Sequence, residues 1–447
     1  MRAVPASVSS IVVRDGRGLP RATVSSNVYT DGVSARISRR RFAASVSFAA
    51  AWLVTDRART IASMVGAEDP ESSVGDLDTF VRARMEAAHV PGLSLAIIRD
   101  GKLLRAAGFG FANLAQQRPM RADTLINVGS VTKTLTCIAV MQLWEQKKFA
   151  LDADVNAHLS FSVRNLAYPE VPVTFRQLLT HTSSIADGPA YDRSYACGDS
   201  RVSLGRWLRD YLTPGSSLYD PQRNFHPWKP GMQFEYSNVA YGLLGHLVET
   251  LSGMSYPDYM RNRVFAPLGM SHSRILLEGM GPESHATPYT YSSNGDIATV
   301  ELRDPSWTAP ADRRGGVQVP HCLYSWGTPP DGLARTSAVE SSRVLRAFMN
   351  GGTLDGQRVL QSRTIKQILS DQHVQFAAQA KPHVQGLTWL RYGGSADGIV
   401  WGHTGEDPGI STLVLFRPRD RRGVVILTNS DGGGRTAAEI ASRVLAS

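Results

Sequence analysis

Hydrophobic and polar positions follow two different periods along this chain, and the periods predict its helices and strands. Apolar residues recur every three or four positions across residues 75–89, which predicts an amphipathic helix. Two short apolar runs follow at residues 93–98 and 103–109, and the Asp100-Gly101 pair between them is a strong β-hairpin signal. The chain is therefore expected to enter its fold through one helix and one hairpin.

The next pattern surrounds a serine. Residues 125–128 predict a short strand, Gly129 makes a turn, and Ser130 opens a helix. Ser130 is therefore expected at a helix N-terminus, where free backbone N–H groups favour negative charge. Lys133 lies one turn further along the same face of the helix. The apolar residues of this helix fall at helical spacing, namely Leu135, Ile138, Ala139 and Leu143.

The rest of the chain separates into a helical middle and an extended end. Residues 151–313 contain helices and loops with little alternation of apolar and polar positions. The simplest packing is an α+β fold in which both ends of the chain form one antiparallel sheet flanked by the terminal helices. The large, mostly helical region is then an insertion, with an active site at the seam. Beyond it, the pattern predicts a helix at 337–350, strands at 399–403, 411–416 and 423–427, and a last helix at 435–445.

Charge is unevenly distributed along the chain of 447 residues, which has a formal net charge of +9. Residues 1–67 contain ten Arg and three Asp, which leaves 38 basic and 36 acidic residues in the remainder. The net charge therefore gives no reason to expect a nucleic acid partner. We predict one leader, residues 1–67, and one catalytic domain, residues 68–447, which is long enough for a large hydrophobic core.

The leader resembles an export signal. The run Ser38-Arg39-Arg40-Arg41-Phe42 precedes an apolar stretch at residues 43–54, and small residues at 65–67 offer a cleavage site. This order is typical of a twin-arginine signal and predicts a periplasmic or secreted protein. The apolar stretch is too short to cross a bilayer, so no stable membrane span is expected. A mitochondrial transit peptide is the alternative, because the segment is rich in Arg and Ser and poor in acidic residues.

Export would also change the chemistry expected of the three cysteines. Cys137 lies in the serine helix and is expected to be a buried thiol. Cys197 and Cys322 lie in turn-rich stretches, and we hypothesise that they pair as a disulfide in the exported protein. The Cys and His spacings indicate no zinc site and the sequence contains no phosphate-binding loop, so neither a metal nor a cofactor is predicted.

The Ser130-Val131-Thr132-Lys133 motif points to nucleophilic chemistry. A serine hydroxyl is a weak nucleophile until a base removes its proton, and a partly buried lysine can be that base. The alternative is a serine that caps a helix, followed by an ordinary surface lysine. Two observations favour a catalytic role over a helix cap. This is the one Ser-x-x-Lys in the sequence, and its lysine lies in an otherwise apolar helix, where a charge is costly.

Two further motifs follow in order along the chain. Tyr236-Ser237-Asn238 is the one Tyr-x-Asn, and His403-Thr404-Gly405 is the one His-x-Gly and lies on a predicted strand. Together with the serine motif, they make the sequence from about residue 77 onward resemble the β-lactamase-related serine hydrolases. That family includes class C β-lactamases, D-Ala-D-Ala carboxypeptidases, D-aminopeptidases and esterases. The resemblance implies the fold shared by serine β-lactamases and penicillin-binding proteins.

The resemblance also implies a role for each motif residue. Ser130 would attack a carbonyl and become acylated. Lys133 and Tyr236 would share the general-base work, and the resemblance does not settle which of the two takes the proton. Tyr236 would need a pKa lowered by nearby cations, with Lys133 as the source, and would later protonate the leaving group. The oxyanion hole would consist of the backbone N–H groups of Ser130 and Glu406. The residues implied to bind substrate are Asn238, His403, Thr404, Gly405 and Glu406.

The third motif departs from the lactamase pattern. His403 stands where the lactamases carry lysine, which favours peptidases and esterases, and it could hold the Tyr236 oxygen or a substrate carboxylate. Glu406 would place a carboxylate beside the oxyanion hole, where it would repel an acidic substrate, tolerate an ester or attract an amine. The structural alternatives are that Asn238 caps a helix, that His403 is an ordinary strand residue, and that His181 shapes a helix end.

These observations predict a serine hydrolase that acts on an ester or amide of a small-molecule or peptide substrate through an acyl-enzyme on Ser130. One alternative is an aminopeptidase-like or acyl-transfer variant of the same site. The other is a non-catalytic, penicillin-binding-like sensor that keeps the pocket. An α/β-hydrolase is disfavoured because the sequence contains no Gly-x-Ser-x-Gly. The sequence makes no prediction of oligomeric state.

Overall fold

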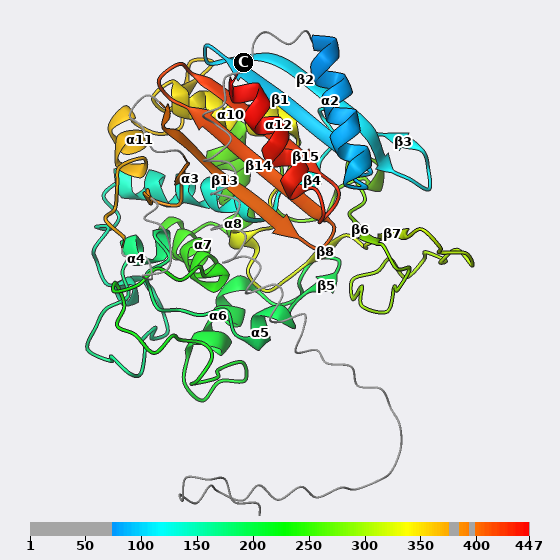
Figure 1. Ribbon diagram of the computed structural model, residues 1–447. Coiled ribbons are helices and arrows are strands. Elements are labelled where there is room, and N and C mark those ends of the chain that lie inside the picture. The colour runs from blue at the N-terminus through cyan, green and yellow to red at the C-terminus, as the bar shows by residue number, and fades with distance from the viewer. Residues whose placement is uncertain (1–73, 375–383, 393–397, 447) are drawn as a thin grey trace, which may run out of the picture. The chain divides into compact units, whose positions relative to one another are not determined.

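One antiparallel sheet joins the two ends of the described chain, which comprises residues 74–374, 384–392 and 398–446 of this computed structural model (Figure 1). The N-terminal hairpin and the C-terminal strands pair directly, so the predicted α+β class is confirmed. The predicted leader, residues 1–67, lies outside the described residues. The strand order is β12 (Leu390–Tyr392), β13 (Val400–Asp407), β14 (Ile410–Arg417), β15 (Arg422–Thr428), β1 (Gly92–Arg99), β2 (Lys102–Asn113) and β3 (Arg118–Pro119).

Helices cover both faces of this sheet, and the alternation of side chains along each strand explains why. In β14, Leu413 and Leu415 pack into the smaller of two hydrophobic cores, whereas Val414 and Phe416 pack into the larger one. The terminal helices close the smaller core, as the sequence predicted, and Figure 1 shows both of them in front of the strands. The helices are α2 (Val74–Ala87) and α12 (Gly434–Ala446) at the smaller core, and α3 (Thr132–Glu145) and α10 (Ala338–Met349) at the larger core.

The predicted helical insertion lies between the serine segment and α10, and Figure 1 shows its helices α4 to α7 grouped below the sheet. No helix of the described residues is long and apolar enough to cross a membrane. The regular elements of this region are η2 (Val155–His158), α4 (Phe175–Leu179), α5 (Pro189–Asp192), α6 (Leu204–Leu212), α7 (Asn238–Ser252), α8 (Tyr256–Tyr259), the π-helix η3 (Met260–Phe265), α9 (Ala266–Leu268) and η4 (Pro282–Ser284).

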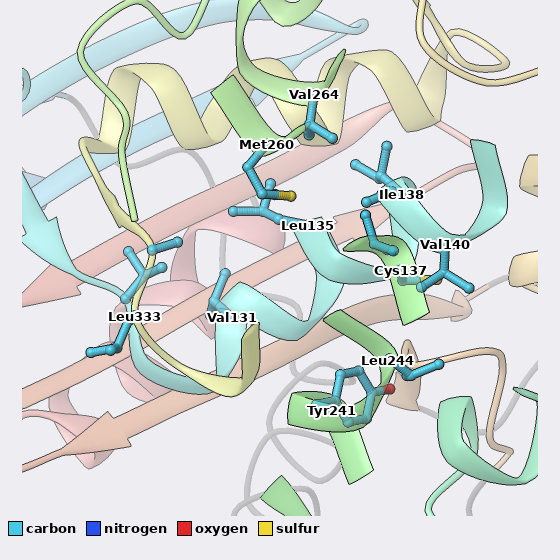
Figure 2. Close-up of a cluster of buried hydrophobic side chains, with 14 of the residues drawn as sticks. Val131, Leu135, Cys137, Ile138, Val140, Tyr241, Leu244, Met260, Val264 and Leu333 are labelled. Carbon is cyan, nitrogen blue, oxygen red and sulfur yellow. The ribbon is translucent and has the colours of Figure 1, made fainter. Parts of the chain in front are cut away.

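The helix α3 is buried on nearly every side. Every residue from Thr132 to Met141 is buried, although the sequence showed only one apolar stripe. Figure 2 shows Leu135 and Ile138 of this helix beside Met260 and Val264 of η3. Because protein interiors are packed as densely as organic crystals, this environment fixes the helix in one position.

Short ladders tie the insertion to the rest of the fold. Three of them pair segments that lie far apart in the sequence, which the period of a single segment does not reveal, and the fourth is a local hairpin at residues 353–358. The ladders are β4 (Ile126–Asn127) with β9 (Arg335–Thr336), β5 (Ala196–Cys197) with β8 (Tyr324–Ser325), β6 (Tyr289–Ser292) with β7 (Val317–Pro320), and β10 (Thr353–Leu354) with β11 (Gln357–Arg358); α11 (Ser362–Ile368) and the 3₁₀ turn η5 (Pro329–Asp331) complete the described elements.

The three cysteines occupy the states that the sequence suggested. Cys197 and Cys322 form a disulfide with their Cα atoms 5.7 Å apart. The bridge joins β5 to the segment that leads into β8. Cys137 is a buried free thiol inside α3, with its sulfur 3.6 Å from the backbone oxygen of Leu387. The disulfide therefore holds together two loops that approach the end of β13.

Two strands differ from the sequence prediction. The predicted strand at 125–128 is only the two-residue β4, which pairs with β9 and not with the large sheet. The predicted strand at 399–403 continues to Asp407 as β13, because it pairs with β14 up to the Asp407–Ile410 register. In the sequence, Asp407-Pro408-Gly409 has the composition of a turn, which hides the last residues of the strand.

Candidate active site

Ser130 lies in a tight turn ahead of its helix. The sequence predicted that Ser130 opens the α-helix, but it belongs to the 3₁₀ turn η1 (Gly129–Val131), and α3 begins at Thr132. The reason is that the Thr132 backbone N–H donates to the carbonyls of Gly129 and Ser130, which continues the tighter turn into the helix. Ser130 keeps part of its surface exposed. A substrate can therefore reach its hydroxyl.

Lys133 is fully buried and makes three hydrogen bonds. Its Nζ lies 3.0 Å from Ser130 Oγ, 2.7 Å from Asn238 Oδ1 and 2.7 Å from the backbone oxygen of Asp331. Burial lowers the pKa of Lys133 from 10.5 to about 8, against the opposing charges of Asp331, Asp187 and Asp407. The structure thus brings Asn238 from a distant part of the chain into one hydrogen-bonded group with Ser130 and Lys133.

Tyr236 lies against the same lysine. The Lys133 Nζ is 4.9 Å from the centre of the Tyr236 ring, and the hydroxyl is buried without a partner in hydrogen-bonding geometry. Burial raises the pKa of Tyr236 well above 10, although the Ser130 hydroxyl opposes the shift. The sequence-based expectation that nearby cations lower this pKa is therefore wrong, since the effect of burial outweighs that of the cations. Tyr236 is a neutral phenol.

His181 supports Tyr236 from behind. Its ring stacks on the Tyr236 ring with centroids 4.2 Å apart, and its Nδ1 accepts the backbone N–H of Ser237 at 3.1 Å. The residue has a φ of 57°, a left-handed conformation that is costly for a side chain with a Cβ. Burial, with the nearby charge of Lys133, lowers its pKa well below 6.5. This environment agrees with the structural reading of His181 as a residue that shapes a helix end.

The start of α7 is held by a carboxylate that the sequence did not single out. Asp187 accepts the backbone N–H groups of Asn238, at 2.8 and 2.9 Å, and of Val239, at 3.0 Å, and also contacts Ser237 Oγ at 3.2 Å. An anion at a helix N-terminus is favourable because the first N–H groups have no partner within the helix. Ser237, rather than Asn238, is the N-cap of α7, which leaves the Asn238 side chain to bind Lys133.

A second carboxylate that the sequence did not single out, Asp331, lies next to Lys133. Asp331 is fully buried and accepts hydrogen bonds from Trp326 Nε1 at 2.7 Å and Thr328 Oγ1 at 2.8 Å. Burial raises its pKa to about 7, against the opposing charge of Lys133. These bonds fix the turn η5, whose last carbonyl accepts from Lys133 Nζ.

The third motif faces this group from β13. His403 is 1% exposed, and its Nδ1 lies 2.6 Å from the carbonyl oxygen of Thr404. A carbonyl only accepts, so Nδ1 carries the proton and the buried, unpartnered Nε2 is an acceptor. Burial, with the charge of Lys133, lowers the pKa of His403 to about 4. A neutral imidazole with a free lone pair binds a donor, such as a phenol, and is poorly suited to the substrate carboxylate that the sequence analysis also allowed.

Two glycines let β13 lie directly against the serine turn. A Cβ added to Gly405 would lie 2.1 Å from the Val128 carbonyl oxygen and 3.1 Å from the Ser130 nitrogen, and one added to Gly129 would lie 2.9 Å from the Glu406 nitrogen. Gly129 also has a φ of 51°. The backbone nitrogens of Ser130 and Glu406 are thereby gathered on the two sides of this contact, as an oxyanion hole would require.

Side chains of β13 alternate between the two faces of the sheet. The Gly405 position faces Ser130, so His403 and Asp407 share that face, while Thr404 and Glu406 point to the other one. The sequence analysis expected the Glu406 carboxylate beside the oxyanion hole. The alternation instead places the Asp407 side chain on the face that contacts Ser130. Only the Glu406 backbone lies at the serine turn. Extending the predicted strand to residue 407 would have revealed this from the sequence.

No cluster of three or more metal-binding side chains occurs among the residues that the structure describes. The site is instead built from one lysine, two neutral histidines, a phenol, an amide and three carboxylates. Asp187 and Asp331 had no detectable signal in the sequence, because each belongs to no predicted motif and acts on a motif residue more than 50 positions away. The arrangement can move a proton from the Ser130 hydroxyl and can stabilise a carbonyl oxygen that gains charge.

Comparisons with known proteins identify the family and the fold of this chain. The family model described as Beta-lactamase matches residues 77–446. The protein flp of Staphylococcus aureus (strain MRSA252) is 23% identical over 355 residues, which cover 79% of this chain and 62% of the relative. This chain thus spans about three fifths of the length of that relative.

Solved structures show the same fold. The octameric penicillin-binding protein homologue from Pyrococcus abyssi superposes with a TM-score of 0.66 at 25% identity, covering 84% of this chain and 77% of that one. The D-amino acid amidase from Ochrobactrum anthropi SV3 gives a TM-score of 0.63 at 21% identity, covering 83% of this chain and 98% of that one. With the family model matched over nearly the whole described region, this chain belongs to the Beta-lactamase family.

Proposed function

We propose that this protein is a serine hydrolase that cleaves an ester or amide through an acyl-enzyme on Ser130. The observation that carries the proposal is the position of Lys133, which is fully buried and whose Nζ lies 3.0 Å from Ser130 Oγ. Membership of the Beta-lactamase family supports a hydrolase of this kind.

Lys133 is suited to be the base that takes the serine proton. A neutral amine has two N–H groups and one lone pair. Two carbonyl acceptors, Asn238 Oδ1 and the Asp331 backbone oxygen, use the two N–H groups, so the lone pair is left for the Ser130 hydroxyl. With a pKa of about 8, a substantial fraction of Lys133 is neutral near physiological pH. Tyr236, whose pKa is raised, serves as a proton donor and not as the resting base.

The reaction then follows in two balanced steps. The Ser130 Oγ forms a bond to the substrate carbonyl carbon while its proton passes to Lys133 Nζ, and the carbonyl oxygen becomes an anion held by the N–H groups of Ser130 and Glu406. The bond to the leaving group breaks as Tyr236 gives the leaving group a proton. Lys133 then returns a proton to Tyr236. Water then attacks the acyl-enzyme carbonyl carbon and loses a proton to Lys133. The bond to Ser130 Oγ breaks as Lys133 passes that proton to the oxygen, which releases the acid and restores the Ser130 hydroxyl.

His403 and its neighbours complete the proposed site. His403 Nε2 is an acceptor for the Tyr236 hydroxyl or for a substrate N–H, and Asn238 holds the base. Thr404 accepts from His403, and Gly405 allows the strand to approach the serine turn. No proposed step uses a metal or a cofactor.

Labelling with a fluorescent fluorophosphonate tests this function, because the probe bonds only to an activated serine. We expect one adduct, on Ser130 by peptide mapping. Turnover is then measured on p-nitrophenyl esters, D- and L-amino-acid anilides and nitrocefin, with hydroxylamine as an acyl acceptor to detect acyl transfer. A protein that is folded but neither labels nor turns over any substrate would be a non-catalytic binder, and the proposal would fall.

We also propose that residues 1–67 direct export and take no part in catalysis. The disulfide between Cys197 and Cys322 supports an oxidising destination, since such bonds persist outside the cytosol. The family match begins at residue 77, beyond this segment. Fractionation of cells that carry the full chain and a variant with Arg39 and Arg40 changed to Lys tests the route. Retention of the unchanged chain in the cytosol would contradict it.

A further inference from the structure

Asp407 places a carboxylate at the serine turn. Its Oδ2 lies 3.1 Å from the position of a Cβ built on Gly129 and 3.4 Å from one built on Gly332. Since consecutive Cα atoms are 3.8 Å apart, Oδ2 lies within about 9 Å of the Ser130 Cα. The residue keeps part of its surface exposed. The carboxylate therefore lies close to the place where a substrate carbonyl would meet Ser130.

The carboxylate is held in place from one side only. Its Oδ1 accepts the Tyr195 hydroxyl at 2.8 Å, and the Tyr195 ring stacks on Trp326 with centroids 4.5 Å apart. The same Trp326 donates to Asp331, so the support of Asp407 and the support of the base share one indole. The disulfide at Cys197 lies two residues after Tyr195 and restrains the same loop.

Asp407 has no cationic partner of its own among the residues that the structure describes. Tyr195 is the one described side chain that donates to it, and no described Arg or Lys forms an ion pair with it. Burial raises its pKa to about 8, with Asp331 adding to the shift and Tyr195 and Lys133 opposing it. A carboxylate that loses solvent without a counter-ion gains most from a cation that arrives with a ligand.

His403, His181 and Lys133 offer no free positive charge to a substrate carboxylate. His403 and His181 have lowered pKa values and are neutral. Lys133 is occupied by Ser130, Asn238 and Asp331. Above about pH 8, where Asp407 is ionised, the charge that faces an incoming acyl group is thus negative, which is the opposite of what a carboxylate-bearing substrate requires.

We propose that Asp407 is the specificity residue of this site, and that it binds an ammonium group carried by the acyl part of the substrate, one or two bonds from the scissile carbonyl. This inference rests on the proposed hydrolase function and names its substrate class: amino-acyl esters or amides with a free amine. Substrates with a carboxylate near the carbonyl bind poorly because Asp407 repels them.

A pair of isosteric substrates isolates the charge. The ethyl esters of betaine and of 3,3-dimethylbutyrate differ by a quaternary nitrogen in place of a carbon, so they match in shape. Acid release by the full-length protein is followed by titration at about pH 8.5, where Asp407 is ionised, and corrected for spontaneous hydrolysis. We expect kcat/KM to favour the cationic ester by about tenfold or more, and Asp407→Asn to abolish most of that preference, which is read as the ratio of the two esters within each variant.

Three further variants keep the test decisive. Asp407→Glu should restore part of the preference, because it restores the charge, and Tyr195→Phe should weaken it without removing it. Asp192→Asn removes another half-buried carboxyl, on α5, and should leave the ratio unchanged. Labelling of Ser130 and turnover of the uncharged ester report that each variant is folded. An equal ratio for the unchanged protein and Asp407→Asn overturns the inference while the hydrolase function stands, whereas a lack of any labelling overturns the function itself.

Discussion

The two walls of the candidate site are built on different principles. On the wall formed by α3 and α7, the base and the carboxylate that supports it are engaged: Lys133 has three partners, and Asp187 binds the backbone at the start of α7. On the wall formed by β13, His403 Nε2 is a buried acceptor without a partner, and Asp407 has a phenol on one oxygen only. Lys133 and Asp187 on the first wall thus have their hydrogen-bond partners within the protein, whereas His403 and Asp407 on the second wall each have an atom left to bind a substrate.

This difference separates chemistry from recognition. A base must hold one orientation and one pKa, so its hydrogen bonds are satisfied within the protein and its helix is buried on nearly every side. A surface that recognises a substrate exchanges water for that substrate. It therefore keeps polar groups that have no partner in the protein and gain one only when the substrate binds. Changes on the first wall should therefore affect all substrates alike, whereas changes at Asp407 should affect the choice between them.

The largest expected effect follows from removal of the nucleophile. Ser130→Ala should lower kcat by about 10³-fold or more for every substrate, because no other group can form the acyl-enzyme. Steady-state turnover and fluorophosphonate labelling both measure it. Turnover near that of the unchanged protein would contradict the mechanism.

Lys133→Arg comes next, since it keeps a cation but removes a titratable base. We expect a loss of about 10²- to 10⁴-fold in kcat/KM. In the unchanged protein, kcat/KM for a neutral ester should rise with pH and level off above about 8, because only neutral Lys133 accepts the serine proton and its pKa is about 8. A rate that is flat from pH 6 to pH 9 would assign the base to another group.

His403 should make the folded state sensitive to acid. Its pKa is about 4 in the folded protein, against 6.5 for a solvent-exposed imidazole, so the unfolded chain binds an extra proton between these values. Stability from this group is complete above about pH 6.5 and is lost as the pH falls toward 4, by roughly 3 kcal/mol.

Chemical denaturation across this pH range measures the slope. Buried carboxyl groups such as Asp331 contribute with the opposite sign, so the comparison is between the unchanged protein and His403→Gln, which share those groups. The free energy of unfolding of the variant should fall less steeply with acid. Parallel slopes would show that His403 is not a buried neutral residue.

Asp187→Ala is expected to have the smallest effect, a loss of about 1–3 kcal/mol in the free energy of unfolding, because it leaves N–H groups of Asn238 and Val239 without an acceptor. Activity should fall with it, since α7 carries the residue that holds Lys133. Ser255→Ala is the matched control: it removes the cap of α8, a hydrogen bond to Asp258, away from the site. If both variants lose stability but neither loses activity, Asp187 does not position the site.

The sequence by itself determined the elements with strong periods and the motifs that carry the chemistry. The hairpin at Asp100-Gly101, the terminal helices and the C-terminal strands lie where their patterns place them. The identity and order of Ser130, Lys133, Tyr236 and His403 were also visible. These features are local, since each depends on residues within a few positions of one another.

Tertiary structure alone decided how those residues behave. The Lys133 Nζ meets Asn238 from 105 positions away and the Asp331 carbonyl from 198. The raised pKa of Tyr236, the neutral state of His403 and the position of Asp407 beside the serine turn depend on which groups exclude water around them. Solvent exclusion and long-range contact arise only when distant segments pack together, so no period or motif within one segment encodes them.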